Sequence, residues 1–306
     1  MSTIKIGIGF GTARVEMPTP QQICAYAEHA EDLGIDSVWL SDRVVGAQLD
    51  IVAVMALFAA RTKRIKMGPS VMTLPAHHPV HVARSYATLD YLSGGCRRVI
   101  MAVGIGNDPH ECLAVGIPPD ERGARMEEGV AVLRKLWSAP NVTHRGRYYQ
   151  FEDVTIEPRP AHGPLDVWIG GRSDVALKRV ARYGDGWFPS FVTPAEFRDG
   201  MQRMNAYAAG YGRAIDPREA GVLLPSYVTD DRGRADALLR QLSDTFKVPP
   251  DGMSLSAAIG PASACAAKLR EFVEAGCTKF VLFPFCAANE LVEQIEIYAR
   301  DIMPRV

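Results

Sequence analysis

The sequence predicts an α/β fold, a TIM (β/α)8 barrel built as a single domain over residues 1–306. Eight short apolar runs occur along the chain, and a stretch with the amphipathic spacing of a helix follows each of them. Strict alternation of this kind implies parallel strands, and eight such units can close into a barrel. An open doubly wound sheet is the competing arrangement. It usually has fewer strands and a GxGxxG fingerprint after the first strand, which this sequence lacks at that position.

The first half of the chain supplies four strand–helix units. Residues 1–11 alternate isoleucine with lysine or glycine, as a strand does, and residues 19–22 form a capping box that opens the first helix. The other predicted elements of this half are strands at 37–40, 65–72 and 98–103 and helices at 50–62, 79–92 and 121–137.

The second half adds four further units after one interruption. Residues 142–160 break the alternation and predict a small hairpin excursion after the fourth helix, with strands at 145–151 and 154–156. Residues 248–256 contain proline and glycine and are expected to form a mobile loop. The predicted strands are 167–169, 186–189, 221–229 and 279–285. One helix begins near 173, a second begins at a capping box over residues 193–196, and the others cover 234–246, 263–276 and 290–302.

A glycine pair separates the fifth strand from its helix. Gly170 and Gly171 let the backbone approach a ligand closely, and Arg172 adds a positive charge beside them. The unpaired N–H groups of the helix that starts near Ser173 attract anions, phosphate above all. Many such turns only connect a strand to a helix, so the prediction of a phosphate-binding turn depends on the residues around it.

The composition excludes several classes of protein. The chain is 47% hydrophobic and 23% charged with a formal net charge of −1, which argues against a nucleic-acid-binding surface. No apolar run approaches the ~18 residues that span a membrane, and the N-terminus has no signal-peptide pattern. Six scattered cysteines indicate reduced thiols, and neither histidines nor carboxylates recur at ligand spacing. We therefore expect a cytoplasmic protein without a metal site.

In barrels of this kind the active site lies at the carboxyl ends of the strands. That end is rich in aromatic residues and glycines and poor in acid–base groups, and no GxSxG nucleophile motif occurs. Histidines cluster only at 77, 78 and 81, and His78 precedes Pro79, as a residue that starts a helix does. We expect a flat aromatic ligand with an anionic tail. The residues expected at this end are Phe10, Asp42, Arg43, Ser70, Val71, Asn107, Gly170–Ser173, Trp187 and Phe285.

Six blocks of sequence occur in a characteristic order through most of residues 1–197. They are AEHAEDLGIDSVW (27–39), LP with HP (74–79), ATLD with LSGG (87–95), ERG with MEE (121–128), GRYY with F (146–151), and GGRS with YGDGW (170–187). Their order resembles the bacterial luciferase-like superfamily, and the C-terminal third matches mainly through AG and FVL in 275–282. The resemblance implies a TIM barrel that binds FMN or the deazaflavin coenzyme F420. Members are flavin-dependent monooxygenases or F420-dependent oxidoreductases that transfer a hydride.

The resemblance also implies roles for individual residues. Gly170–Ser173 match the family's phosphate-binding turn, and Arg122 and Arg125 match the region that offers this phosphate a basic partner. Ser70 and Val71 fall where the family has a non-prolyl cis peptide behind the flavin ring. Gly104 and Gly106 match the end of the fourth strand, which passes beside the ring.

Two positions depart from the family pattern. Arg43 follows Asp42 where many members have a histidine near the reactive edge of the ring, and it either stabilises an anionic flavin or substrate or forms a salt bridge at the rim. We take Asp42 and Arg43 as the candidate catalytic residues. Asn107 stands where several F420-dependent members have glutamate, whereas the segments after strands four and five resemble relatives often assigned F420. On balance F420 is slightly favoured over FMN, with an unidentified small organic substrate.

Other functions stay open from the sequence. A reduced-FMN monooxygenase that uses O2 is the first alternative, and a flavin-binding barrel without turnover is the second. A barrel of aldolase or phosphosugar type would need a lysine or paired carboxylates at a strand end, and none is found. Helix 50–62 is apolar on more than one face, which predicts a homodimer with Met55 or Phe58 near the two-fold axis.

Overall fold

The structure is a computed structural model that describes residues 4–11, 17–46 and 48–306. Eight parallel strands form a closed ring, which confirms the predicted barrel. In one arc β12, β1, β2 and β3 are hydrogen-bonded neighbours, and in another β5, β8 and β9 are. Bridges of β3 to the residues before β5 and of β9 to β10, with the pairing of β10 to β12, close the ring. The barrel strands are β1 (Lys5–Phe10), β2 (Ser37–Leu40), β3 (Lys66–Pro69), β5 (Met101–Gly104), β8 (Val167–Gly170), β9 (Gly186–Phe188), β10 (Gly221–Val228) and β12 (Lys279–Pro284).

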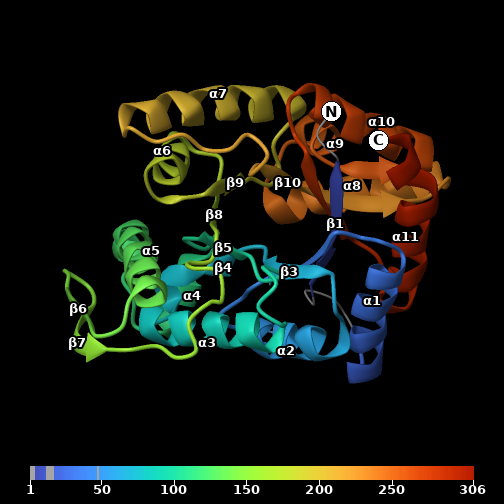
Figure 1. Cartoon of the computed structure of the whole chain (residues 1–306). Coiled ribbons are helices and arrows are strands. Elements are labelled where there is room, and N and C mark those ends of the chain that lie inside the picture. The colour runs from blue at the N-terminus through green and yellow to red at the C-terminus, as the bar shows by residue number, and fades with distance from the viewer. Residues whose placement is uncertain (1–3, 12–16, 47) are drawn as a thin grey trace.

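Helices surround this ring of strands (Figure 1). The two predicted capping boxes are present, because Thr19 and Gln22 cap α1 reciprocally and Thr193 and Glu196 cap α7 in the same way. The longer helices are α1 (Pro20–Asp32), α2 (Ile51–Arg61), α3 (Pro79–Leu92), α5 (Arg122–Ser138), α6 (Asp174–Tyr183), α7 (Pro194–Gly210), α8 (Arg232–Phe246), α10 (Ala262–Glu274) and α11 (Leu291–Ile297), and α4 (Pro109–Ala114) and α9 (Pro250–Leu255) are short. Among the described residues, no helix is long and apolar enough to cross a membrane.

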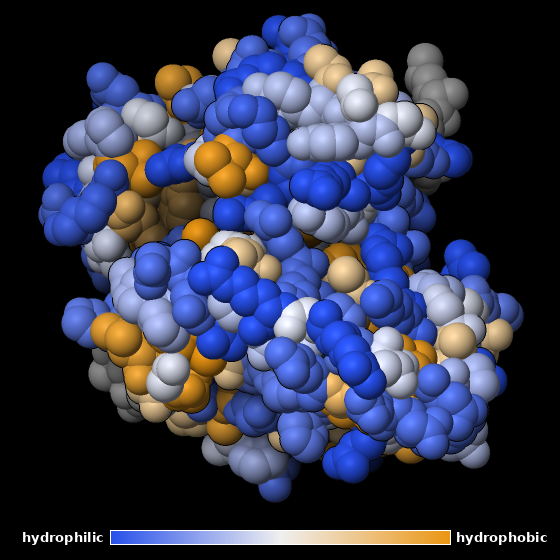
Figure 2. Space-filling view, turned by 90° about the vertical axis from the view of Figure 1, so that its left-hand side faces the viewer, coloured by the Kyte–Doolittle hydropathy of each residue, from blue (hydrophilic) through white to orange (hydrophobic). Residues whose placement is uncertain are grey.

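The interior of the barrel is filled by large side chains. Trp39, Trp168 and Phe188 form one buried cluster with Ala102 and Val281, and the rings of Trp39 and Phe188 lie 4.7 Å apart. A filled interior means that a ligand must bind at one end of the barrel and not along its axis. The surface in Figure 2 is mostly hydrophilic and is hollowed at the left edge of the view, with hydrophobic residues on the walls of the hollow.

The predicted strand 65–72 is divided in the structure. β3 ends at Pro69, the Ser70–Val71 peptide bond is cis, and β4 (Met72–Thr73) then pairs with β5. The predicted hairpin is also present, but its strands lie earlier than expected, as β6 (Val142–Arg145) and β7 (Gln150–Val154). Its turn therefore falls on residues 146–149, which the sequence pattern assigned to a strand.

The expectation of a mobile loop at 248–256 is wrong. Residues 250–255 form α9, which begins at Pro250, and β11 (Ala258–Gly260) follows and pairs with the end of β10. Proline is favoured in the first turn of a helix, and Pro250 occupies this position in α9. Met253 is fully buried against Leu242 and Val248, and this packing holds the segment in place.

The prediction that Met55 or Phe58 lies at a two-fold axis is also wrong. Both side chains are fully buried inside the chain's own core. The outward face of α2 instead carries the half-buried Val52, Ala56 and Leu57. The apolar pattern of this helix was read correctly, but two of its faces are covered by the barrel and the neighbouring helices, so its largest side chains point inward.

Candidate active site

The glycine turn after β8 has the geometry of an anion site. Gly171 has a φ of +106°, which favours glycine, and a Cβ there would lie 2.9 Å from the Cβ of Ala176. Its carbonyl accepts a hydrogen bond from the Trp187 indole nitrogen at 2.8 Å, which fixes the turn. The Ser173 hydroxyl caps α6 by accepting from the Ala176 amide. The start of a ten-residue helix therefore faces this rigid turn.

The sequence places Arg172 beside the turn as a positive charge, and in the structure its side chain is also bonded to a backbone carbonyl. Its side chain is exposed, and its guanidinium donates a hydrogen bond to the Phe191 carbonyl in the segment after β9. Arg172 thus ties two carboxyl-end loops together.

The Ser70–Val71 segment fills the space between three strand ends. A Cβ on Gly104 would lie 2.7 Å from Val71 Cγ2, and one on Gly170 would lie 3.1 Å from Val71 Cγ1. A side chain at position 104 would therefore displace Val71, and one at position 170 would crowd it. The Ser70 hydroxyl is buried and has no hydrogen-bond partner within the described parts of the chain. The cis peptide that the family resemblance implied is confirmed, and it sets the Val71 side chain across the ends of β5 and β8.

Arg122 and Arg125 make contacts within the chain. The Arg122 guanidinium donates to the carbonyls of Gly106 at 3.0 Å and Pro119 at 3.0 Å, so it supports the loop after β5. Gly106 has a φ of +76° and packs on Thr73 at the end of β4. Arg125 pairs with Glu121 and lies over the Tyr148 ring.

Asn107, one position beyond Gly106, is exposed. The structure therefore places Arg122 against Gly106, whereas Arg125 pairs with Glu121 and Asn107 is exposed.

Asp42 is a buried carboxylate at the end of β2. Its side chain is only 7% exposed, and Oδ2 accepts a hydrogen bond from the Thr73 amide at 2.9 Å. The imidazole Nε2 of His77 lies 3.5 Å from the same oxygen. The Tyr86 hydroxyl is also buried there, and burial followed by the Asp42 charge raises the pKa of Tyr86 well above its ordinary value.

Sequence reasoning missed His77 as an Asp42 partner. The histidine cluster was visible as a signal, but nothing in it distinguished His77 from His78. His78 has the helix-starting role expected of it, because its Nδ1 accepts from the Val80 amide at the first turn of α3. The fold alone brings the end of β2 and residue 77 together.

Arg43 turns away from Asp42. Its side chain is 49% exposed and its guanidinium pairs with the buried Glu111 of α4, with Asp108 at 3.9 Å. Glu111 also accepts from the Val44 amide. Of the two readings of Arg43 that the sequence allowed, these contacts match the salt bridge at the rim.

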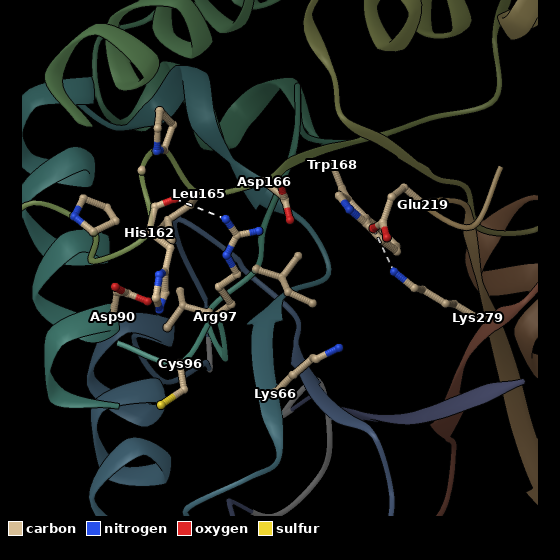
Figure 3. Close-up of a pocket in the computed structure, with 15 residues that line it drawn as sticks. Lys66, Asp90, Cys96, Arg97, His162, Leu165, Asp166, Trp168, Glu219 and Lys279 are labelled. Carbon is tan, nitrogen blue, oxygen red and sulfur yellow. Dashed lines mark hydrogen bonds and ion pairs between the residues drawn. The ribbon is translucent and has the colours of Figure 1, made fainter. Parts of the chain in front are cut away.

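A pocket of about 220 Å³ lies at the opposite, amino end of the barrel (Figure 3). Its walls carry Lys66, Asp166 and Trp168, and Lys279 pairs with Glu219 at 2.8 Å. Side chains at this end of such barrels serve stability more often than chemistry. We therefore place the candidate site at the carboxyl end. No group of three or more metal-ligating side chains occurs in residues 4–11, 17–46 and 48–306.

Comparisons with known proteins identify the family of the chain. A model of the luciferase-like monooxygenase family matches residues 3–247. An F420-dependent glucose-6-phosphate dehydrogenase of Amycolatopsis mediterranei is 37% identical over 185 residues, 57% of this chain and 55% of the relative. One from Nakamurella multipartita is 32% identical over 251 residues, 76% of this chain and 70% of the relative.

The chain thus spans only about half the length of the first of these relatives. Among solved structures, an F420-dependent secondary alcohol dehydrogenase in complex with an F420–acetone adduct superimposes with a TM-score of 0.85 at 22% identity, over 99% of both chains. At this identity the likeness establishes the barrel fold.

Proposed function

Because the chain belongs to the luciferase-like monooxygenase family, we propose that it is an F420-dependent oxidoreductase acting on a small organic substrate. The relatives described above are named as F420-dependent enzymes, which supports F420 over FMN as the cofactor. Bound F420 would supply a hydride acceptor that needs no oxygen.

The observation that carries this proposal is the arrangement around Val71. Its side chain forms a shelf against Gly104 and Gly170, and the turn at Gly171–Ser173 continues from the same strand β8. A flat ring system with an anionic chain fits a shelf and a helix start that are joined in this way. The buried Ser70 hydroxyl, which lacks a partner among the described residues, offers a polar contact beside the shelf.

Asp42 and His77 supply the acid–base chemistry in this proposal. Nε2 of His77 is buried 3.5 Å from Asp42 Oδ2 and makes no hydrogen bond among the described residues. In this proposal Nε2–H closes on the Asp42 carboxylate, which leaves the lone pair of Nδ1 to accept a proton. A carboxylate that orients an imidazole in this way is a recurrent device in catalysis. In this proposal His77, and not Arg43, acts with Asp42.

We also propose that residues 1–306 act as one domain within a cytoplasmic homodimer. The pairing of β1 with β12 makes both ends of the chain part of one barrel, and Cys24, Cys96, Cys112, Cys265 and Cys277 form no disulfide. The outward face of α2, with Val52, Ala56 and Leu57 half-buried, is the proposed contact. Leu57→Asp should yield a monomer by light scattering with an unchanged circular dichroism spectrum.

The function is tested by titrating the purified protein with F420, FMN and FAD while following cofactor fluorescence. Saturable binding of F420, with weaker or no binding of the flavins, is expected. Preferred binding of FMN would support the oxygen-dependent alternative. Binding of none of the three would refute the proposal.

A further inference from the structure

Four phenylalanines form a continuous aromatic surface at the carboxyl end of the barrel. The rings of Phe283 and Phe285 lie 5.3 Å apart, those of Phe285 and Phe246 6.0 Å, and those of Phe246 and Phe191 4.5 Å. We call these four residues the aromatic wall. Phe283 is 8% exposed and Phe246 is 37% exposed, so the wall runs from the barrel interior to the surface.

The inner end of the wall lies over the end of β1, and β1 is the neighbour of β2, the strand that leads toward Asp42. A Cβ on Gly9 would lie 2.0 Å from the Phe283 ring, and one on Gly11 would lie 2.4 Å from it. Glycine at both positions therefore lets the ring lie over the end of β1. The neighbouring strand β2 pairs with β1 up to Leu40 and continues to Asp42. The aromatic wall and the Asp42–His77 pair are thus on adjacent sides of one barrel mouth.

The outer end of the wall borders the proposed cofactor turn. Arg172 follows the Gly170–Gly171 turn, and its guanidinium holds the carbonyl of Phe191. The helix α9 supports the wall from behind, since the buried Met253 belongs to the cluster on which Phe191 and Phe285 pack. The wall therefore has a fixed position relative to the Val71 shelf.

Three arginines described at this end are already bonded within the chain. Arg43 pairs with Glu111, Arg122 donates to backbone carbonyls, and Arg172 donates to Phe191. A sugar phosphate would need a second anion site besides the glycine turn. The barrel mouth presents an aromatic surface on one side and the Asp42–His77 pair on the adjacent side. This arrangement suits a substrate that has an apolar body and one oxygen-containing group.

We propose that the aromatic wall binds the apolar body of the substrate, and that the substrate is a small alcohol whose carbinol carbon carries a cyclic or aromatic hydrocarbon group. This inference rests on the proposed function. Oxidation of the alcohol would pass the hydroxyl proton to Nδ1 of His77 and turn the carbinol carbon into a carbonyl carbon. Bound F420, in its oxidised form, would supply the two-electron acceptor for the carbinol hydrogen, so that protons and electrons balance.

The first arm of the test compares substrates. We expect the enzyme with F420 to oxidise 1-phenylethanol with a kcat/KM at least about 100-fold above that for glucose 6-phosphate, because the wall buries the ring. A preference for glucose 6-phosphate, with F420 bound, would overturn the inference and leave the proposed function standing.

The second arm needs no cofactor. Binding of acetophenone to the free protein is measured by saturation-transfer NMR, for the wild type and for Phe246→Ser, whose side chain is exposed enough for the variant to fold. We expect the variant to bind about 10-fold more weakly. The matched control is Tyr91→Ser on α3, an aromatic residue that is 66% exposed and outside the wall.

The two arms separate the hypotheses. Failure of F420 to bind refutes the proposed function, whereas the acetophenone measurement still decides whether the wall binds an apolar ring. Equal binding of acetophenone by wild type and Phe246→Ser, or no binding to either, contradicts the inference.

Discussion

The two ends of the barrel satisfy their polar side chains in different ways. At the amino end, Lys279 pairs with Glu219 at 2.8 Å, and Lys5 and Lys66 share Asp36 at 3.9 and 3.7 Å. At the carboxyl end, the Ser70 hydroxyl is buried without a partner in the described part of the chain, and so is the hydroxyl of Tyr86, near the Asp42 carboxylate. The amino end also crowds its cations, since the charge of Lys66, with burial, lowers the pKa of Lys5.

The two ends of the barrel therefore differ in how their charged side chains are paired. Ion pairs at the amino end join lysines and carboxylates across strand ends, although Trp168 Nε1 and Thr278 Oγ1 are buried there without a hydrogen-bond partner among the described residues. Buried polar atoms without partners cost free energy unless a ligand or a reaction uses them, and at the carboxyl end one of them lies near the Asp42 carboxylate. The following predictions, in order of decreasing effect, test this contrast.

The largest effect is expected at the glycine turn. Gly171→Asp should weaken F420 binding at least about 100-fold, because a side chain at a φ of +106° would lie against Ala176 and its charge would repel an anion. Fluorescence titration measures the loss. The control is Gly212→Asp, at another positive-φ glycine with nothing within 4 Å of its Cβ, which should leave the affinity unchanged.

Asp42→Asn should lower kcat about 100-fold with 1-phenylethanol while F420 still binds, because the amide no longer orients the His77 imidazole. In ¹⁵N spectra of the free protein, His77 should be protonated at Nε2 in its neutral form and should lose this preference in the variant. Asp36→Asn is the matched change at the amino end and should leave kcat intact. An unchanged tautomer in Asp42→Asn would argue against the pair.

A smaller effect is expected from the ion pair at the amino end. Lys279 and Glu219 are 17% and 33% exposed, and their coupling in a double-mutant cycle with Lys279→Met and Glu219→Gln should be about 0.5–1 kcal/mol. Denaturant unfolding measures it. A change in F420 affinity in either variant would mean that this end also contributes to the cofactor site.

The smallest effect concerns pH. Burial opposes the shift at Glu31, but hydrogen bonds from the amides of residues 63–65 outweigh it, so the pKa of Glu31 lies below its ordinary value of 4.5. A lowered folded-state pKa stabilises the fold above pH 4.5, and this contribution is lost as pH falls through the folded-state value. The stability difference between wild type and Glu31→Gln should therefore shrink below pH 4.5. A constant difference between pH 3 and 7 would contradict the assignment.

Much of the fold could be predicted because its signals are local. The capping boxes at Thr19 and Thr193 and the alternation of apolar runs depend on residues a few positions apart, and both were confirmed. The prediction for 248–256 failed because Pro250 was taken as a loop residue although it stands in the first turn of α9, and because the burial of Met253 is not visible in the local pattern. The prediction that Met55 or Phe58 lies at a dimer axis failed because periodicity shows an apolar face but not which neighbour covers it.

The sequence by itself determined the barrel and the glycine turn at 170–173, because both are set by residue types at short spacing, whereas the cis bond at Ser70–Val71 was implied only by the family resemblance. Only the tertiary structure decided the partners of side chains that end different strands. Arg43 pairs with Glu111, Arg172 donates to the Phe191 carbonyl, and His77 Nε2 lies 3.5 Å from Asp42 Oδ2. These partners lie far apart along the chain or on loops of unconstrained direction, and the closed ring of parallel strands is what brings them within a few ångströms.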